Sequence, residues 1–125
     1  MMRKRKKKSF EIIFYEKLLK KRPDFVQALS CLGEAYTRKG LYEEGLNIDK
    51  KLVELRPQDP IVHYNLACSL SLVGEPQEAL EELKKAVLLG YDDFSYILKD
   101  PDLENVRKLP SFSDFFHKII KINSE

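Results

Sequence analysis

The feature that most constrains this chain is a set of side chains that returns after 34 residues. Leu32 is followed by Leu66, and Gly40 by Gly74, at the same offset that separates Pro23 from Pro57. The same shift places Glu44, Leu46, Lys50, Lys51, Val53 and Leu55 over Glu78, Leu80, Lys84, Lys85, Val87 and Leu89. A fixed period of this length is typical of repeat proteins, in which each period is one supersecondary unit.

Each period contains two stretches with helical periodicity. Apolar residues at three- and four-residue steps predict helices over about 26–39 and 42–55, with Gly40 between them. Pro57 ends the second helix, because proline lacks the backbone N–H and disfavours helix in the residue before it. The next period repeats this plan around Gly74. A single helical hairpin cannot hide its apolar face, so we expect neighbouring hairpins to stack on one continuous core.

These positions resemble the tetratricopeptide repeat family, whose pattern sets a large residue, Leu-Gly, Tyr, a turn Gly, a small residue, an aromatic residue, Ala and Pro. The first repeat has at these positions Leu29, Leu32, Gly33, Tyr36, Gly40, Gly45, Asp49, Leu52 and Pro57. The second repeat has His63, Leu66, Ala67, Leu70, Gly74, Ala79, Leu83, Ala86 and Tyr91. Asp49 departs from the pattern, since a packed aromatic side chain is expected there. The resemblance implies an all-α fold, a short right-handed α-solenoid of antiparallel helix pairs with C-terminal capping helices.

The resemblance divides the chain into five segments. They are a basic disordered arm at 1–8, a half-repeat helix at 9–22, repeat 1 at 26–57, repeat 2 at 60–91, and a degenerate third repeat with the C-terminal cap at 92–125. Pro101 falls where Gly33 and Ala67 sit in the earlier units, and the third repeat fails there. Ser111 and Asp114 have the spacing of a capping box at the start of the last helix.

Charge separates a basic arm from a mildly acidic remainder. The whole chain carries a net charge of +2, and all six residues from Arg3 to Lys8 are basic, so the rest carries −4. Such an arm can bind nucleic acid, attract anionic lipid or act as a disordered solubilising tail. We favour the tail, which is the commonest outcome for an isolated charge run. A peripheral module tethered to anionic membrane or RNA through this arm is the alternative function.

Several kinds of chemistry lack a sequence signal. The two cysteines, Cys31 and Cys68, cannot form a disulfide framework, and no Cys/His cluster has zinc-ligand spacing. The glycines form no phosphate-binding loop. No apolar run approaches the roughly 18–20 residues of a membrane span. We therefore expect no catalytic residues, no metal, no cofactor, no small-molecule substrate and a cytoplasmic location, with both cysteines as buried thiols and His63 packed in or at the edge of the core.

The family resemblance also implies a concave groove lined by the first helix of each repeat. Its expected residues are Gln27, Ser30, Glu34, Thr37, Arg38, Ile61, Tyr64, Asn65, Cys68, Ser71 and Leu72. We expect a protein or peptide partner there, with Tyr64 as an anchor and Asn65 bonding to peptide backbone. Glu34 would repel the chaperone C-terminal carboxylates that some family members bind, so we do not expect that ligand.

The half-repeat helix predicts a second contact surface. Its apolar residues spread around much of the helix, and no preceding helix covers them. An exposed apolar patch of a few hundred Å² usually marks an interaction site. The sequence therefore predicts self-association or partner binding through Phe10, Ile13, Phe14 and Leu18.

Overall fold

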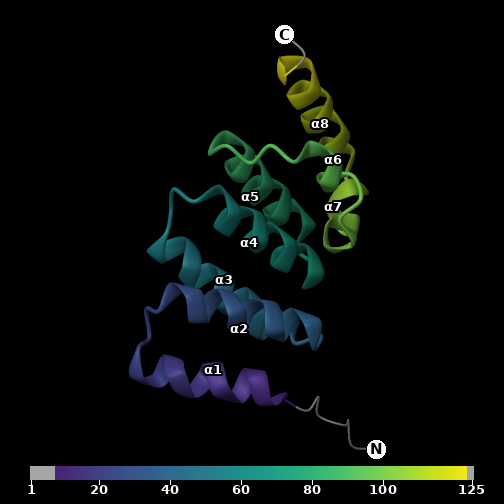
Figure 1. Cartoon of the computed structure of the whole chain (residues 1–125). Coiled ribbons are helices and arrows are strands. Elements are labelled where there is room, and N and C mark those ends of the chain that lie inside the picture. The colour runs from purple at the N-terminus through teal and green to yellow at the C-terminus, as the bar shows by residue number, and fades with distance from the viewer. Residues whose placement is uncertain (1–7, 124–125) are drawn as a thin grey trace, which may run out of the picture.

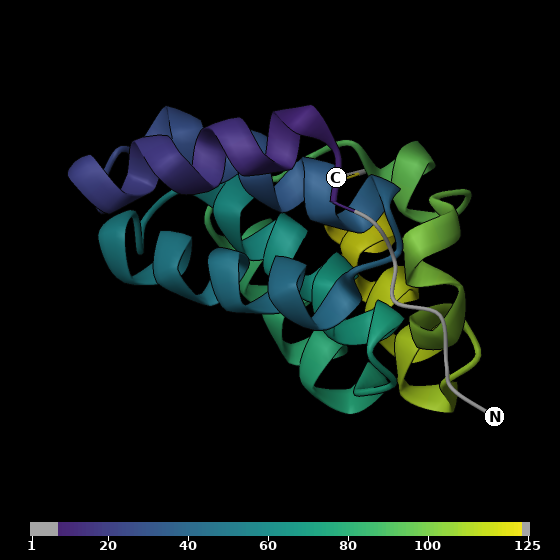
Figure 2. The same ribbon diagram turned by 90° about the horizontal axis from the view of Figure 1, so that it is seen from below.

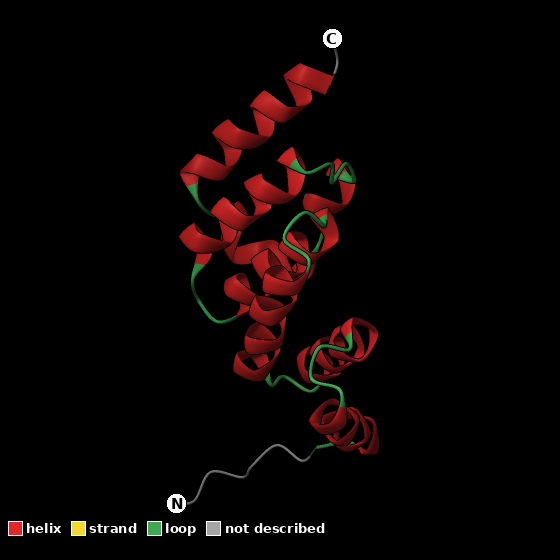
Figure 3. Cartoon of the chain, turned by 90° about the vertical axis from the view of Figure 1, so that its left-hand side faces the viewer, coloured by secondary structure: helices red, strands yellow, loops and turns green. Residues whose placement is uncertain are grey.

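The structure, a computed structural model, describes residues 8–123. This range is helical, without strands (Figure 3). The helices are α1 (Phe10–Lys21), α2 (Val26–Arg38), α3 (Tyr42–Leu55), α4 (Pro60–Leu72), α5 (Pro76–Leu88), α6 (Phe94–Ile97), the 3-10 turn η1 (Pro101–Leu103), α7 (Glu104–Arg107) and α8 (Pro110–Asn123). Of the basic arm only Lys8 is described, so the predictions for Arg3 to Lys7 lie outside the described residues.

Consecutive helices pack side by side along the stack in Figure 1: α1 with α2, α2 with α3, α3 with α4, and α4 with α5. This arrangement is an α-solenoid of helical hairpins, as the 34-residue period predicts. The two complete hairpins, α2 with α3 and α4 with α5, occupy the sequence ranges in which helices are expected.

The same turn closes both hairpins. Gly40 and Gly74 have φ values of 74° and 88°, a left-handed conformation in which residues other than glycine are strained. Beyond each glycine the next amide donates back into the helix, from Leu41 to the carbonyl of Tyr36 and from Glu75 to that of Leu70. The period therefore fixes the geometry of the turn as well as the positions of the helices.

Side chains one period apart occupy equivalent places in the core. Ile12, Leu46 and Leu80 follow one another at 34-residue steps and are 0%, 6% and 1% exposed. Leu32 and Leu66 are likewise buried. These residues lie in successive helices that pack on each other, in three buried clusters that meet through the partly buried Ile48 and Val53.

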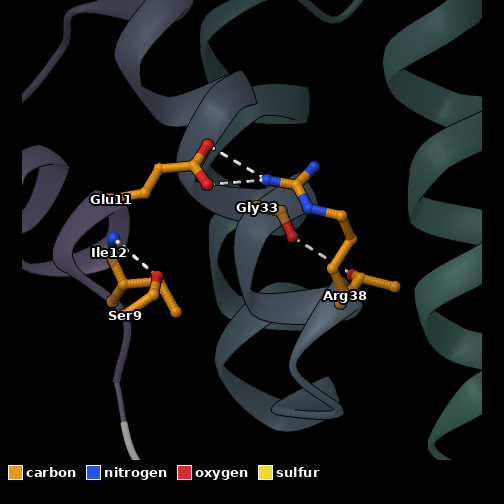
Figure 4. A network of polar contacts seen from close by, with 6 residues as sticks. Ser9, Glu11, Ile12, Gly33 and Arg38 are labelled. Carbon is orange, nitrogen blue, oxygen red and sulfur yellow. Dashed lines mark hydrogen bonds and ion pairs between the residues drawn. The ribbon is translucent and has the colours of Figure 1, made fainter.

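Helix α1 takes the place of the second helix of a preceding hairpin, and Figure 2 shows it beside α2 at the end of the stack. Its Ile12 packs with Leu32 and Tyr36. Ser9 caps the helix by accepting from the amide of Ile12, and Glu11 accepts two hydrogen bonds from Arg38 at 3.0 and 2.9 Å (Figure 4). A polar clamp at the edge of an apolar contact thus fixes α1 on α2.

After α5 the repeat breaks down. The third unit begins as α6, a helix of 4 residues, and Pro101 opens η1. Asp100 caps η1 by accepting from the amide of Asp102 at 3.0 Å, and Arg107 donates to the carbonyls of Ile97 and Asp100. These bonds tie the short segments to one another. The turn η1 packs against α4, α7 packs against α4 and α5, and α8 packs against α7.

The capping box expected at the last helix does not form. Helix α8 begins at Pro110, so Ser111 lies inside the helix. Its hydroxyl is buried without a hydrogen-bond partner. The reason is that Pro110 already suits the first helical position, which starts the helix one residue earlier than the capping pattern requires.

Within residues 8–123, none of the helices is both long enough and apolar enough to cross a membrane.

The contribution of the buried core to stability can be tested with two leucines of one helix. In α5, Leu83 is 0% exposed and Leu88 is 86% exposed. We expect Leu83→Ala to lower the free energy of unfolding by about 2–5 kcal/mol, because it removes buried methyl groups and leaves a cavity. The matched change Leu88→Ala should stay within about 0.5 kcal/mol. Urea unfolding followed by circular dichroism measures both; equal losses would contradict the shared core.

Candidate functional site

A groove lies between α2 and α4, with α3 at its floor and η1 at one end. Its cavity measures about 300 Å³. Seven of the residues that the sequence placed in the groove line this cavity: Ser30, Glu34, Thr37, Arg38, Asn65, Cys68 and Leu72. The first helices of the two repeats therefore supply the walls of a single concave surface.

Four other residues expected in the groove lie elsewhere. Gln27 and Ile61 are exposed but do not line the cavity, whereas Tyr64 and Ser71 are buried. The hydroxyl of Tyr64 donates to Asp100 at 2.5 Å, and its ring stacks on Tyr91 with centroids 4.2 Å apart. The role of Tyr64 as an anchor is therefore corrected: it packs inside the fold because Tyr91, at the end of repeat 2, and Asp100, in the C-terminal segment, supply its partners.

Five residues of the cavity were not expected there. They are Gly33, Asp49, Leu52, Ser69 and Asp102. The sequence did single out Asp49, because it departs from an apolar pattern, but it gave no indication that this position faces the groove. One period later the equivalent residue is Leu83, which is fully buried. A charged residue in a core position was thus the available signal for this part of the site.

Asp49 lies at the groove floor with its carboxylate held on one side. Oδ2 accepts a hydrogen bond from the hydroxyl of Ser69, which joins α3 to α4. Oδ1 faces Gly33, where a Cβ atom would lie 3.4 Å from it. The residue is only 7% exposed. Burial raises the pKa of Asp49 to about 6; the Ser69 hydrogen bond opposes this rise and the negative Glu34 adds to it.

The groove carries unbalanced negative charge. Glu34, Asp49 and Asp102 line it, and none of the three forms an ion pair within residues 8–123. Arg38 is the cation among the cavity residues, and Glu11 already binds it at 2.9 Å. Burial, followed by the nearby Asp100 carboxylate, also raises the pKa of Asp102. The electrostatic field of the groove therefore favours a positive ligand.

Cys68, Asp100 and Asp102 form the described grouping that comes nearest to a metal site, with potential ligand atoms within 4.8 Å of one another. The structure explains this grouping without an ion. Asp100 accepts from the hydroxyl of Tyr64, from the amide of Asp102 and, at 3.7 Å, from the thiol of Cys68. Burial and the Asp100 carboxylate raise the pKa of the Cys68 thiol well above its ordinary value, so the sulfur stays protonated and is a poor ligand.

His63 is a buried residue of α4 that does not line the cavity. It is 6% exposed. Its Nδ1 lies 2.8 Å from Oε2 of Glu82, and its Nε2 lies 2.7 Å from the carbonyl oxygen of Pro57. His63 therefore connects α4 to α5 and to the preceding loop, which leaves neither ring nitrogen available to act as a base for Cys68.

Comparison with known proteins identifies two relatives of this chain. The chain is 34% identical to a protein of Arabidopsis thaliana that is named as chloroplastic, over 99 residues, which covers 75% of this chain and 30% of that protein. It is 32% identical to Superkiller protein 3 of Saccharomyces cerevisiae over 81 residues, which covers 65% of this chain and 6% of that protein. Both relatives are tetratricopeptide-repeat proteins, and the helical stack fits repeats of that type.

No family model matches the chain. The chain spans less than a third of the length of either relative.

Asp49 predicts an unusual dependence of stability on pH. A carboxyl whose pKa rises from 3.8 to about 6 on folding binds more protons in the folded state, so its ionisation lowers the free energy of unfolding as pH rises through that interval. At pH 7 the loss is as much as about 3 kcal/mol. We expect Asp49→Asn to raise stability at neutral pH and to flatten the profile between about pH 4 and 7.

The control for this measurement is Asp114→Asn, which changes an exposed carboxyl on α8. Urea unfolding at several pH values should give Asp114→Asn the same profile as the unmodified chain. A profile for Asp49→Asn that parallels the unmodified chain would show that burial of this carboxyl has no energetic cost.

Proposed function

We propose that this chain is a non-catalytic protein-interaction module, an adaptor or assembly scaffold, that binds a segment of a protein partner in the groove between α2 and α4. The observation that supports this most directly is the cavity of about 300 Å³ lined by side chains of two successive repeats. The relatives are repeat proteins of a type that serves generally as interaction scaffolds. Solenoids offer such concave surfaces to their partners.

The lining favours a polypeptide in an extended or helical form. Asn65 is half-buried in the wall and its side-chain amide makes no hydrogen bond within the described residues, so this amide is available to donate to and accept from peptide backbone. The partly exposed Leu72 adds an apolar contact at the same wall. Backbone bonding beside small apolar contacts is the pattern by which grooves hold peptides.

The state of the groove cysteine supports the non-catalytic part of this proposal. A nucleophilic cysteine needs a base or a lowered pKa. Burial raises the pKa of Cys68, and the hydrogen-bonding groups of His63 are already engaged. We keep the cytoplasm as the expected location, although one relative is named as chloroplastic.

We also propose that the outer face of α1 contacts a second copy of the chain. Phe10 is 85% exposed, Phe14 51% and Ile13 42%. Leu18 is partly buried beside them. Three large apolar side chains on one helix at the end of a solenoid form a surface of the kind that partners cover.

Asn65 provides a test of the groove. A photo-reactive amino acid at Leu72, expressed in cells of the source organism, should crosslink partner proteins that the same group at the exposed Leu88 does not capture. Asn65→Ala should then reduce this capture several-fold, because one backbone hydrogen bond contributes about 0.5–1.5 kcal/mol. Asn47→Ala, on the exposed side of α3, is the matched control. The same proteins at both positions, or unchanged capture by Asn65→Ala, would argue against the groove.

The surface of α1 has a separate test. Sedimentation equilibrium of the full chain should show a mass that rises toward two copies with concentration. Phe10→Ser combined with Phe14→Ser should restore the mass of one chain, because it removes the apolar area that drives association. Ile61→Ser combined with Leu88→Ser changes two other exposed apolar residues and should leave association intact. A single-chain mass for the unmodified protein at every concentration would rule out self-association.

A further inference from the structure

We propose that the groove between α2 and α4 selects a basic segment of its protein partner and receives a lysine or arginine side chain against the carboxylates of Glu34, Asp49 and Asp102. This inference rests on the proposed function and names the chemistry of the ligand. Two observations carry it, the charge of the cavity and the geometry of Asp49.

The charge of the cavity is the first observation. Three carboxylates surround it, one at the floor, one in the wall and one at the end formed by η1. The guanidinium of Arg38 is turned to Glu11 on α1, with Nη2 2.9 Å from Oε2, so it does not neutralise them. A cationic side chain entering the groove would supply the missing charge, whereas an acidic one would meet like charge on three sides.

The geometry of Asp49 is the second observation. This residue is almost fully buried, yet it also lines the cavity. Only Oδ2 has a hydrogen-bond partner within residues 8–123, the hydroxyl of Ser69. Oδ1 lies toward Gly33, a residue of the cavity wall without a side chain to cover it. A buried carboxylate oxygen that opens into a cavity and lacks a partner is an acceptor for a ligand N–H.

The shape of the site also suits this ligand. Gly33 lets α2 lie close to α3, because a Cβ atom there would lie only 3.2 Å from Ile48 and 3.4 Å from Asp49. Lysine and arginine bury an aliphatic stem and place their charge at the tip. The partly exposed Leu72 can contact such a stem while the tip reaches Asp49. Acidic and neutral side chains lack the cationic tip that the carboxylates would attract.

Fluorescence anisotropy with defined peptides tests the proposal on the full chain. The probes are three labelled, acetylated and amidated nonapeptides in which Lys, Gln or Glu alternates with Ala. We expect the lysine probe to bind about tenfold or more tightly than the glutamine probe, and the glutamate probe to bind least, because the cavity carboxylates attract only the first. Its affinity should rise as pH increases through about 6, where Asp49 ionises, and fall with added salt.

Two triple variants with equal net charge separate the groove from the rest of the surface. Glu34→Gln, Asp49→Asn and Asp102→Asn together should weaken the lysine probe about tenfold or more. Glu43→Gln, Glu54→Gln and Glu78→Gln together remove three exposed carboxylates outside the cavity and should change binding less than about twofold. Circular dichroism checks that both variants fold. If the two triple variants behave alike, the lysine probe binds the surface in general and the proposal is overturned.

The experiment also separates this proposal from the one on which it rests. Equal or tighter binding of the glutamine or glutamate probe in the groove would overturn the basic ligand and leave the interaction module intact. Failure of all three probes, together with no crosslinking at Leu72, would count against both.

The chain has its own basic segment, which must be distinguished from a partner. Arg3→Ser, Lys4→Ser, Arg5→Ser, Lys6→Ser and Lys7→Ser together remove five charges and keep Lys8, which pairs with Glu16 at 2.9 Å. We expect this change to alter lysine-probe affinity less than about threefold, since the three carboxylates that line the cavity remain in place. A gain of about tenfold or more that vanishes in the groove triple variant would show that the arm itself occupies the groove, and would overturn a partner as the source of the basic segment.

Discussion

The whole structure depends on apolar side chains that only a neighbouring hairpin can cover. Ile12, Leu46 and Leu80 recur at one period in α1, α3 and α5, and each is buried because neighbouring helices of the stack pack against it. Helix α1 closes one side of this interior, and the short C-terminal segments with α8 close the other. The groove and the exposed face of α1 both result from this stacking, since one lies between hairpins and the other lies where the stack stops.

Asp49 is a polar residue at a position that is apolar and buried in the next repeat. The next repeat has Leu83 at the equivalent position, fully buried and packed in the main core. In the first repeat the carboxylate bonds to Ser69 instead, and Ser69 stands where the preceding first helix has Ala35. The hydrogen bond satisfies one oxygen, so the repeat folds, but the burial of charge lowers its stability at neutral pH. A core position thereby becomes the floor of the groove.

The C-terminal segment decides which residues of α4 face the groove. Asp100 begins η1 and accepts hydrogen bonds from both Tyr64 and Cys68, which lie one helical turn apart on α4. Together with the ring of Tyr91 it draws Tyr64 into the interior. The same segment places Asp102 at the end of the cavity. The broken third repeat therefore caps the solenoid and adds negative charge to the groove.

The sequence by itself determined the helices, their glycine turns and the stacking, because each depends on residues that are close in the chain or one period apart. It also indicated the groove walls on α2 and α4, and it marked Asp49 as an exception. Only the tertiary structure showed that Tyr64 is buried, that Glu11 neutralises Arg38, and that Asp49 and Asp102 meet in one cavity. The physical reason is that these contacts join segments outside the repeat register, α1 and η1, whose positions depend on how they pack on the ends of the stack.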